Sequence, residues 1–177
     1  MRVIGLAGWS GAGKTTLLRR LIPHLVGQGV RVSTVKHAHH GFDVDQPGRD
    51  SWEHRQAGAA EVLVASSVRW ALMHEHRGGA EPALPDLLAR LGPADLVLVE
   101  GFKREGHPKI EVFRAANGKP ALHGGDPAIV AVASDVPLAA GVPVLHLDDI
   151  PGIAAAALAH AAPVAALLEQ RSLLEQR

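Results

Sequence analysis

The residues best suited to chemistry form a glycine-rich segment near the start of the chain. Positions 8–15 read Gly-Trp-Ser-Gly-Ala-Gly-Lys-Thr and fit the pattern G-x-x-x-x-G-K-[ST] at every fixed position. In such a loop the backbone N–H groups surround phosphate oxygens, the lysine reaches the β- and γ-phosphates, and the hydroxyl binds Mg²⁺. The segment predicts a nucleoside-triphosphate site formed by Ser10, Gly11, Ala12, Gly13, Lys14, Thr15 and Thr16, the last at the α-phosphate.

An acidic residue stands where a second magnesium contact is expected. Residues 96–99 are Leu-Val-Leu-Val, which is typical of a strand buried on both faces, and Glu100 follows them. Because ligands of open α/β sheets bind at the carboxyl ends of strands, we expect Glu100 to face Mg²⁺ or the attacking water and to act with Lys14 in catalysis. Asp95 is disfavoured, since it lies about 15 Å away at the opposite end of the strand. The alternative for Glu100 is a surface acid at a strand end.

A long polar loop at residues 37–49 follows the strand expected at residues 31–36, and the segment from Lys36 to Arg55 that contains it carries several charged side chains. It emerges at the same edge as the phosphates, where loops commonly sense the γ-phosphate. Its candidate water-mediated Mg²⁺ ligands are Asp43, Asp45 and Asp50, and its candidate cations for transferred charge are Lys36 and Arg49. The alternative for each residue is a solvated loop side chain.

Histidines in this loop raise the possibility of a transition-metal site. His37, His39 and His40 fall within four positions, and imidazole suits zinc, nickel and copper. A loop fixes no ligand geometry, so an exposed histidine cluster without a biological metal is the favoured interpretation. His74 and His76, which alternate along a strand, are weaker candidates.

One further acid is a candidate for reading the nucleotide base. Asp135 ends the apolar strand expected at residues 129–133. A carboxylate accepts two hydrogen bonds from the N–H and NH₂ groups of guanine, which adenine does not offer. Asp135 therefore predicts a preference for guanine, and the alternative is a simple turn at the strand end.

The elements that must position these residues alternate between strands and helices. The first part of the chain reads strand, loop, helix, strand, which indicates a parallel sheet with right-handed crossovers. Strands are expected at 3–7, 31–36, 61–65, 68–73, 96–99, 110–113, 129–133 and 144–147, and helices at 14–26, 50–57, 82–91 and 153–162, before a polar tail at 170–177. Two of these strands, 61–65 and 68–73, succeed each other without a helix and predict an antiparallel hairpin.

The predicted fold class is α/β. We expect a P-loop NTPase fold, with a mostly parallel central sheet, flanking helices and the added hairpin. Residues 1–177 are expected to form a single nucleotide-binding domain, because chains usually divide only beyond roughly 250 residues. A C-terminal helical extension begins at about residue 151.

Composition restricts the possible partners. Lys and Arg number 18 and Asp and Glu number 18, so the chain has no net charge with which to gather nucleic acid. The absence of cysteine excludes thiolate zinc sites, iron–sulfur ligation and cysteine nucleophiles. No apolar run approaches the roughly 18 residues of a membrane span. We therefore expect a cytoplasmic protein that binds neither nucleic acid nor membrane.

Taken together, these segments resemble the MobB family of molybdopterin-guanine dinucleotide biosynthesis adaptors. The resemblance runs in order from about residue 2 to residue 150. It rests on residues 5–18, on Val-Lys-His-Ala-His-His-Gly-Phe at 35–42, on Gly-Arg-Asp-Ser at 48–51, on His-Arg-Gln-Ala-Gly-Ala at 54–59, on Leu-Val-Glu-Gly-Phe-Lys at 98–103 and on Pro-Lys-Ile-Glu-Val at 108–112. The glycine-rich loop alone is generic, whereas the other segments in this order are specific.

The resemblance implies a GTP-binding P-loop protein that forms a homodimer and hydrolyses GTP slowly. Such a protein acts with the MobA guanylyltransferase, which joins GMP to molybdopterin, and supplies nucleotide or helps to deliver the cofactor to molybdoenzymes. It also implies phosphate binding by residues 11–16, Mg²⁺ contacts by Thr15 and Glu100, and roles for the loop at 36–50. The basic residues Lys103, Arg104 and Lys109 are candidates for a pterin phosphate or an acidic partner; solvated loop charges are the favoured alternative.

Three other functions use the same loop. A metallochaperone GTPase would carry nickel or zinc on the histidine cluster, but the missing cysteine and the Val-Glu-Gly-Phe-Lys segment weigh against it. A small-molecule kinase would need an arginine-rich lid over an acceptor pocket, for which only Arg49 and Arg55 are candidates. A non-catalytic nucleotide-binding module is the third alternative and borders on the adaptor.

Overall fold

The computed structural model describes residues 1–38 and 41–175, and the contacts divide the chain into two compact units. Unit 1 comprises Met1–His37 and Leu84–Arg177, and unit 2 comprises Ala38–Ala83. The expectation of a single nucleotide-binding domain stays a prediction, and each unit is described by itself below.

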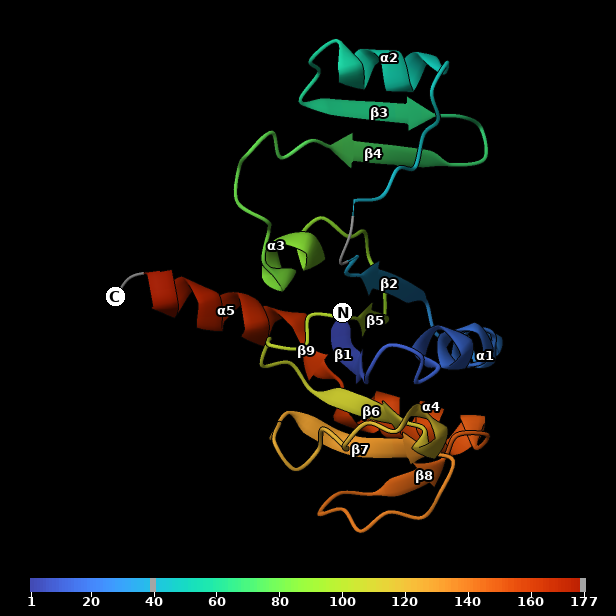
Figure 1. Cartoon of the computed structure of the whole chain (residues 1–177). Coiled ribbons are helices and arrows are strands. Elements are labelled where there is room, and N and C mark those ends of the chain that lie inside the picture. The colour runs from blue at the N-terminus through green and yellow to red at the C-terminus, as the bar shows by residue number, and fades with distance from the viewer. Residues whose placement is uncertain (39–40, 176–177) are drawn as a thin grey trace. The chain divides into compact units, whose positions relative to one another are not determined.

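Unit 1 is built on a mostly parallel sheet, so the predicted α/β fold class is confirmed. Its parallel strands run in the order β2-β5-β1-β6-β7-β8, and a short β9 pairs antiparallel with β1 (Figure 1). The strands are β1 (Arg2–Ala7), β2 (Val32–Lys36), β5 (Leu96–Glu100), β6 (Lys109–Phe113), β7 (Ile129–Ser134), β8 (Val144–His146) and β9 (Ala162–Pro163). The carboxyl ends of the parallel strands therefore share one edge, with β1 between β5 and β6.

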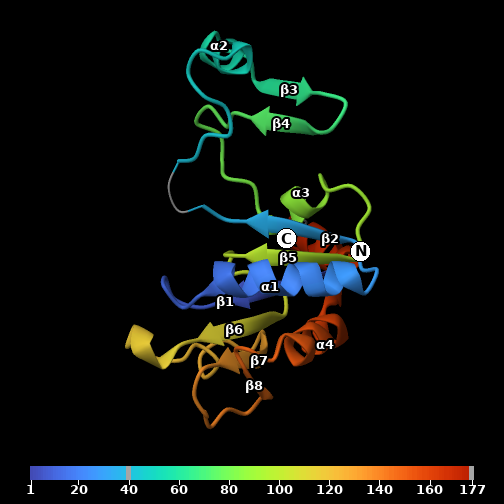
Figure 2. The ribbon, with the colours of Figure 1, turned by 90° about the vertical axis from the view of Figure 1, so that its right-hand side faces the viewer.

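Helices cover both faces of this sheet (Figure 2). On one face α1 (Lys14–Gly27) and α4 (Ile150–His160) pack on side chains such as Ile4 and Leu98. On the other face α3 (Leu84–Leu88) and the start of α5 (Val164–Glu175) pack on Val3 and Val97. The apolar stripe that the sequence predicts for α1 is buried at its leucines, whereas Val26 is 54% exposed and Ile22 only partly buried; the buried residues are Leu17, Leu18, Leu21 and Leu25. Pro23 lies inside the helix without ending it.

Unit 2 consists of α2 (Asp50–Gln56) and an antiparallel hairpin of β3 (Glu61–Ala65) and β4 (Trp70–His74). The hairpin is confirmed. Asp50 is the first residue of α2 and directly follows Arg49. Among the described residues of this unit, Val62 is the single buried hydrophobic residue, so unit 2 has almost no apolar core of its own.

The C-terminal region corrects one expectation. Residues 170–177 were expected as a polar tail, but the backbone is helical through Glu175. The physical reason is composition, because residues 164–175 are rich in Ala, Leu, Glu, Gln and Arg and contain neither glycine nor proline. Within the described part of the chain, no helix is both long and apolar enough to cross a membrane.

Candidate nucleotide-binding site

The glycine-rich loop joins β1 to α1 at the carboxyl edge of the sheet in unit 1. Gly11 and Gly13 have φ values of +80° and +96°, a region that side chains with a Cβ rarely adopt. A Cβ on Gly8 would lie 2.6 Å from the carbonyl oxygen of Val112 on β6. Because Gly13 precedes α1 and has no side chain, nothing of its own covers the first N–H groups of the helix, which are suited to bind an anion.

Lys14 lies folded against this loop. Its Nζ donates hydrogen bonds to the carbonyl oxygens of Gly8 at 2.9 Å and Trp9 at 3.1 Å. Burial lowers the pKa of Lys14; the positive charges of Lys103 and Lys36 lower it too, and Glu100 opposes them. The amine of Lys14 thus bonds with two carbonyl oxygens of the loop, which it can exchange for phosphate oxygens. The neighbouring lysine charges favour the approach of an anion.

Thr15 and Glu100 form the part of the site that fits a magnesium ion. The Thr15 hydroxyl donates to Oε1 of Glu100 at 3.0 Å. Glu100 ends β5 beside Leu6 of β1 and Lys36 of β2, so the sheet register brings it to the loop. Two adjacent oxygen donors suit Mg²⁺, which keeps several waters and takes its remaining ligands from phosphate.

Asp95 lies at the other end of β5, as expected. Its carboxylate accepts hydrogen bonds from Arg31, from the backbone N–H at 2.8 Å and from the guanidinium at 3.1 and 3.3 Å. These bonds hold the pKa of Asp95 below its usual value. The structure therefore gives Asp95 a structural partner far along the strand from the glycine-rich loop.

The other predicted phosphate-binding residues occupy the loop and the first turn of α1. Ala12 is buried and donates its N–H to the Trp9 carbonyl at 3.1 Å, which closes the loop. The Ser10 carbonyl accepts a hydrogen bond from the side chain of Asn117 at 3.0 Å. Thr16 is exposed in the first helical turn. The phosphate roles of these residues stay predictions.

Asp135 follows β7 at the same edge, on the side of β1 away from β5. Its Oδ1 accepts the backbone N–H of Ala115 at 2.9 Å, and its Oδ2 lies 3.9 Å from Nη1 of Arg114. The guanidinium of Arg114 also lies 3.4 Å from the point where a Cβ on Gly13 would be. Asp135 therefore connects the end of β7 to the segment after β6, whose Arg114 lies beside the glycine-rich loop.

Arg114 and Asn117 are the residues that sequence reasoning did not identify. Both belong to the segment around the 3₁₀ helix η1 (Ala115–Asn117), which follows β6 and contacts the loop through Asn117. The signal was available in principle, since Arg114 directly follows a predicted strand that ends at this edge. Its proximity to the loop required the strand order, which places β6 next to β1.

The candidate residues of the long loop divide between the two units. Lys36 ends β2, and the His37 ring stacks on Phe102 with the ring centres 4.7 Å apart. His39 and His40 lie outside the described residues. Asp43 and Asp45 both accept hydrogen bonds from Arg55 within unit 2, at 2.9 and 2.7 Å.

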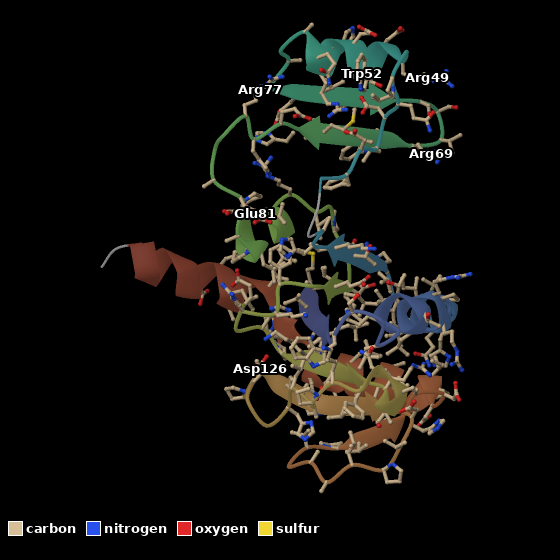
Figure 3. All side chains as sticks on the ribbon, in the orientation of Figure 1. Arg49, Trp52, Arg69, Arg77, Glu81 and Asp126 are labelled. Carbon is tan, nitrogen blue, oxygen red and sulfur yellow. The ribbon has the colours of Figure 1, made fainter. Side chains whose placement is uncertain are left out.

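Unit 2 also holds the remaining loop and histidine candidates. Figure 3 shows Arg49, which precedes α2, at the end of unit 2 that carries the hairpin turn. His74 ends β4, with its ring centre 5.5 Å from that of His76. Where the structure describes side chains, no group of three or more His, Cys, Asp or Glu residues is arranged to hold a metal ion. The magnesium and charge roles suggested for Asp43, Asp45, Asp50 and Arg49 stay predictions.

The basic cluster expected after β5 is not a cluster. Lys109 is 1% exposed, begins β6 opposite Gly5, and bonds with the Glu105 carbonyl and with Asp126 at 3.2 Å. Asp126 lies in the loop before β7 (Figure 3). Lys109 is therefore a buried, paired residue in the body of the sheet, whereas Lys103 lies at the glycine-rich loop, with its Nζ 5.3 Å from the centre of the Trp9 ring.

Comparison with known proteins gives a consistent result. Residues 3–135 match the family model MobB, described as molybdopterin guanine dinucleotide synthesis protein B. The molybdopterin-guanine dinucleotide biosynthesis adapter protein of Escherichia coli (strain K12) is 48% identical over 86% of this chain and 89% of its own, and that of Haemophilus influenzae is 44% identical over 86% and 85%. A crystal structure of molybdopterin-guanine biosynthesis protein B superposes with a TM-score of 0.67 at 30% identity, over 89% of this chain and 97% of its own.

Proposed function

Because the chain belongs to the MobB family, we propose that it is an adapter in the biosynthesis of molybdopterin guanine dinucleotide that binds GTP and Mg²⁺ at the glycine-rich loop of unit 1. In this proposal it assists the MobA guanylyltransferase and works on the route by which molybdopterin reaches molybdoenzymes. A cytoplasmic location, expected from the sequence, is part of the same proposal.

The observation that carries the proposal is the contact between Thr15 and Glu100. These two residues are 85 positions apart in the sequence, yet the hydroxyl of one lies 3.0 Å from the carboxylate of the other at the end of the glycine-rich loop. Such a pair holds Mg²⁺ in nucleotide sites, where the ion bridges phosphate oxygens. When bound, Mg²⁺ would neutralise phosphate charge; Lys14 would exchange its two loop carbonyls for phosphate oxygens.

The preference for guanine is assigned to Asp135. Its Oδ1 already accepts the N–H of Ala115, while Oδ2 has the more distant Arg114 as its neighbour at 3.9 Å. A carboxylate in this position supports recognition of the N–H and NH₂ groups of guanine. The nucleotide would then lie along the sheet edge, with its base near β7 and its phosphates at the loop.

Hydrolysis of GTP is proposed to be slow and secondary to binding. Lys14 would stabilise charge on the phosphates, and Glu100 would orient Mg²⁺ or the attacking water. Oε1 of Glu100 accepts a hydrogen bond from the Thr15 hydroxyl, which supports a role for this carboxylate in binding Mg²⁺ together with Thr15.

We also propose a homodimer, supported by the surface of unit 2. The exposed fractions of Val68, Trp70 and Phe42 are 82%, 67% and 74%, and Val62 alone is buried among the described hydrophobic residues of this unit. A two-stranded hairpin with so little core is marginal by itself, and a second copy would cover these side chains. Light scattering of the purified chain tests this state, and a monomeric mass at micromolar concentration contradicts it.

A competition experiment tests the proposed function. GTP, GDP and ATP are titrated into the protein in the presence of Mg²⁺ by calorimetry, with and without the purified guanylyltransferase. We expect binding of GTP in preference to ATP, dependence on Mg²⁺, and an increase in guanylyltransferase activity on addition of the chain. A preference for ATP, or transfer of phosphate to a metabolite, would favour the kinase alternative and overturn the proposal.

A further inference from the structure

We propose that Lys103 binds the terminal phosphate of the nucleotide and that Trp9 holds its ammonium group in place until the nucleotide arrives. The inference rests on the proposed function and adds to it a residue that distinguishes GTP from GDP.

Trp9 brings two ammonium groups to the start of the glycine-rich loop. Its carbonyl oxygen accepts a hydrogen bond from Nζ of Lys14 at 3.1 Å, and Nζ of Lys103 lies 5.3 Å from the centre of its ring. The ring itself is fixed, because the indole N–H donates to the Pro120 carbonyl at 2.8 Å. An aromatic ring attracts a cation only weakly, so a phosphate group can draw the ammonium group away from the ring.

The backbone after β5 is shaped to direct Lys103 to this position. Gly101 and Phe102 have φ values of +102° and +48°, and the second is a costly conformation for a residue with a side chain. The Phe102 ring is held by stacking on His37, with ring centres 4.7 Å apart. A Cβ on Gly101 would lie 2.5 Å from the Cβ of His37, so only glycine fits the turn. Unfavourable backbone of this kind is retained where the surrounding structure requires a particular side-chain position.

The charges around Lys14 favour the binding of an anion. Lys14 lies in the positive fields of Lys103 and Lys36, and Glu100 is the acid that offsets them. The charges of Lys103 and Lys36 both repel the charge of Lys14, and a polyphosphate relieves this repulsion.

The strand order indicates which phosphate Lys103 contacts. Asp135 follows β7 on one side of β1, and Lys103 follows β5 on the other. A nucleotide with its base near Asp135 has its phosphates at the loop after β1 and its terminal phosphate on the side of β5. Lys103 is therefore placed for the γ-phosphate, and its loss should affect GTP more than GDP.

The test compares Lys103→Ala with Arg104→Ala, which removes the next exposed cation in the chain. GDP and a non-hydrolysable GTP analogue are titrated with Mg²⁺ by calorimetry. A charge-assisted contact to phosphate predicts about a tenfold loss of affinity for the GTP analogue in Lys103→Ala. Affinity for GDP should change by less than about twofold, and Arg104→Ala should resemble the unmodified protein for both ligands.

Trp9 provides a second readout. In a Trp52→Phe/Trp70→Phe background Trp9 is the remaining tryptophan, since the chain has three. We expect its fluorescence to change more with the GTP analogue than with GDP, because Lys103 leaves the ring for the γ-phosphate. In the same background with Lys103→Ala, this difference between the two ligands should disappear.

The outcomes separate the two proposals. If the unmodified protein binds neither nucleotide, the proposed function fails. If it binds both and Lys103→Ala leaves both affinities unchanged, or weakens them equally, the assignment of Lys103 to the terminal phosphate is overturned while GTP binding stands. A Trp9 signal that is the same for GDP and the GTP analogue also overturns the assignment.

Discussion

Two charged clusters of the molecule are built in opposite ways. In unit 2 the Arg55 guanidinium, 12% exposed, bonds with Asp43, Asp45 and Glu75 at 2.7 to 2.9 Å, so one cation is surrounded by three acids. Hydrogen bonds with Glu75 and Asp45 raise the pKa of Arg55 further above its usual value. At the glycine-rich loop of unit 1 the balance is reversed, since Lys14 lies in the positive fields of Lys103 and Lys36, which Glu100 opposes.

The ratio of cations to acids in a cluster indicates whether its cations serve the structure or bind a ligand. A cation with its own carboxylates is held by the protein and contributes to its structure. Cations gathered without enough acids make the folded state less favourable unless a ligand neutralises them. Their removal should therefore weaken binding and leave stability intact, whereas removal of Arg55 should do the reverse.

The largest effect is expected for Lys14→Ala. Loss of the ammonium group at the loop should weaken GTP binding by about a hundredfold or more, because the phosphates lose their central cation. The melting temperature should stay equal or rise slightly, since one repelling charge is gone. Calorimetry and thermal unfolding measure the two quantities, with Lys119→Ala as an exposed control in the same unit. Unchanged GTP affinity would show that the cluster does not bind phosphate.

Arg55→Ala is expected to have the second largest effect, on stability. It leaves three acids together in a unit whose single buried hydrophobic residue, among those described, is Val62. Fluorescence of Trp52 and Trp70 should report unfolding of unit 2 at a clearly lower temperature, with GTP affinity retained. Arg31→Ala, which removes an exposed pair with Asp95, is the control. Equal melting temperatures for the two variants would contradict a structural role for the Arg55 cluster.

In contrast to the two charged clusters, the imidazole of His107 is buried without a charge partner in the described part of the chain and stays neutral. His107 is 1% exposed, neither ring nitrogen has a partner among the described residues, and its Nε2 lies 2.4 Å from where a Cβ on Gly5 would be. Burial, followed by the charge of Lys109, lowers the pKa of His107 from 6.5 to about 4. The unfolded chain therefore binds a proton near pH 6.5, and the folded chain does so only near pH 4.

The sign of the pH dependence follows. Above pH 6.5, the pKa of His107 in the unfolded chain, this histidine does not reduce the stability of the fold. As the pH falls from 6.5 toward 4, the pKa in the folded chain, the free energy of unfolding decreases by up to about 3 kcal/mol. Urea unfolding of the unmodified protein and of His107→Leu, compared across this range, isolates the effect from the other histidines. Parallel curves for the two proteins would show that His107 does not remain neutral.

The smallest effect is expected for Asp135→Asn. The amide keeps an oxygen for the N–H of Ala115 but replaces the other carboxylate oxygen with a donor, which should reduce the preference for GTP over ATP by about tenfold. Calorimetry with both nucleotides measures the ratio. Equal weakening for both would mean that Asp135 serves to position the segment at 114–117.

Local patterns were sufficient for the elements around the glycine-rich loop. The apolar run at 3–7, the glycines after it and the leucine stripe of α1 each follow from short-range rules, and Glu100 follows from its place after a buried strand. The contact between Thr15 and Glu100 depends on β5 lying next to β1, which the βαβ pattern favours without fixing the neighbour.

Other features depend on contacts distant in the sequence. Lys109 reads as a surface cation until Asp126 and the Glu105 carbonyl are placed around it. The weak core of unit 2 was not evident, because Leu63 and Trp70 fit a hairpin pattern yet remain 61% and 67% exposed. A helix through Glu175 was underestimated because polar residues were taken to end it, although their intrinsic helix propensity is high.

The pairing of β9 with β1 has a consequence for the order in which the chain can fold. Pro163 and Ala162 lie opposite Arg2 and Val3, and the guanidinium of Arg2 donates to carbonyls at the end of α4, among them Leu158. During synthesis the β1 segment is made long before these partners, which follow some 150 residues later. Contacts of such high sequence separation slow folding, so the strand that precedes the glycine-rich loop stays incompletely covered until residues 158–163 have been made.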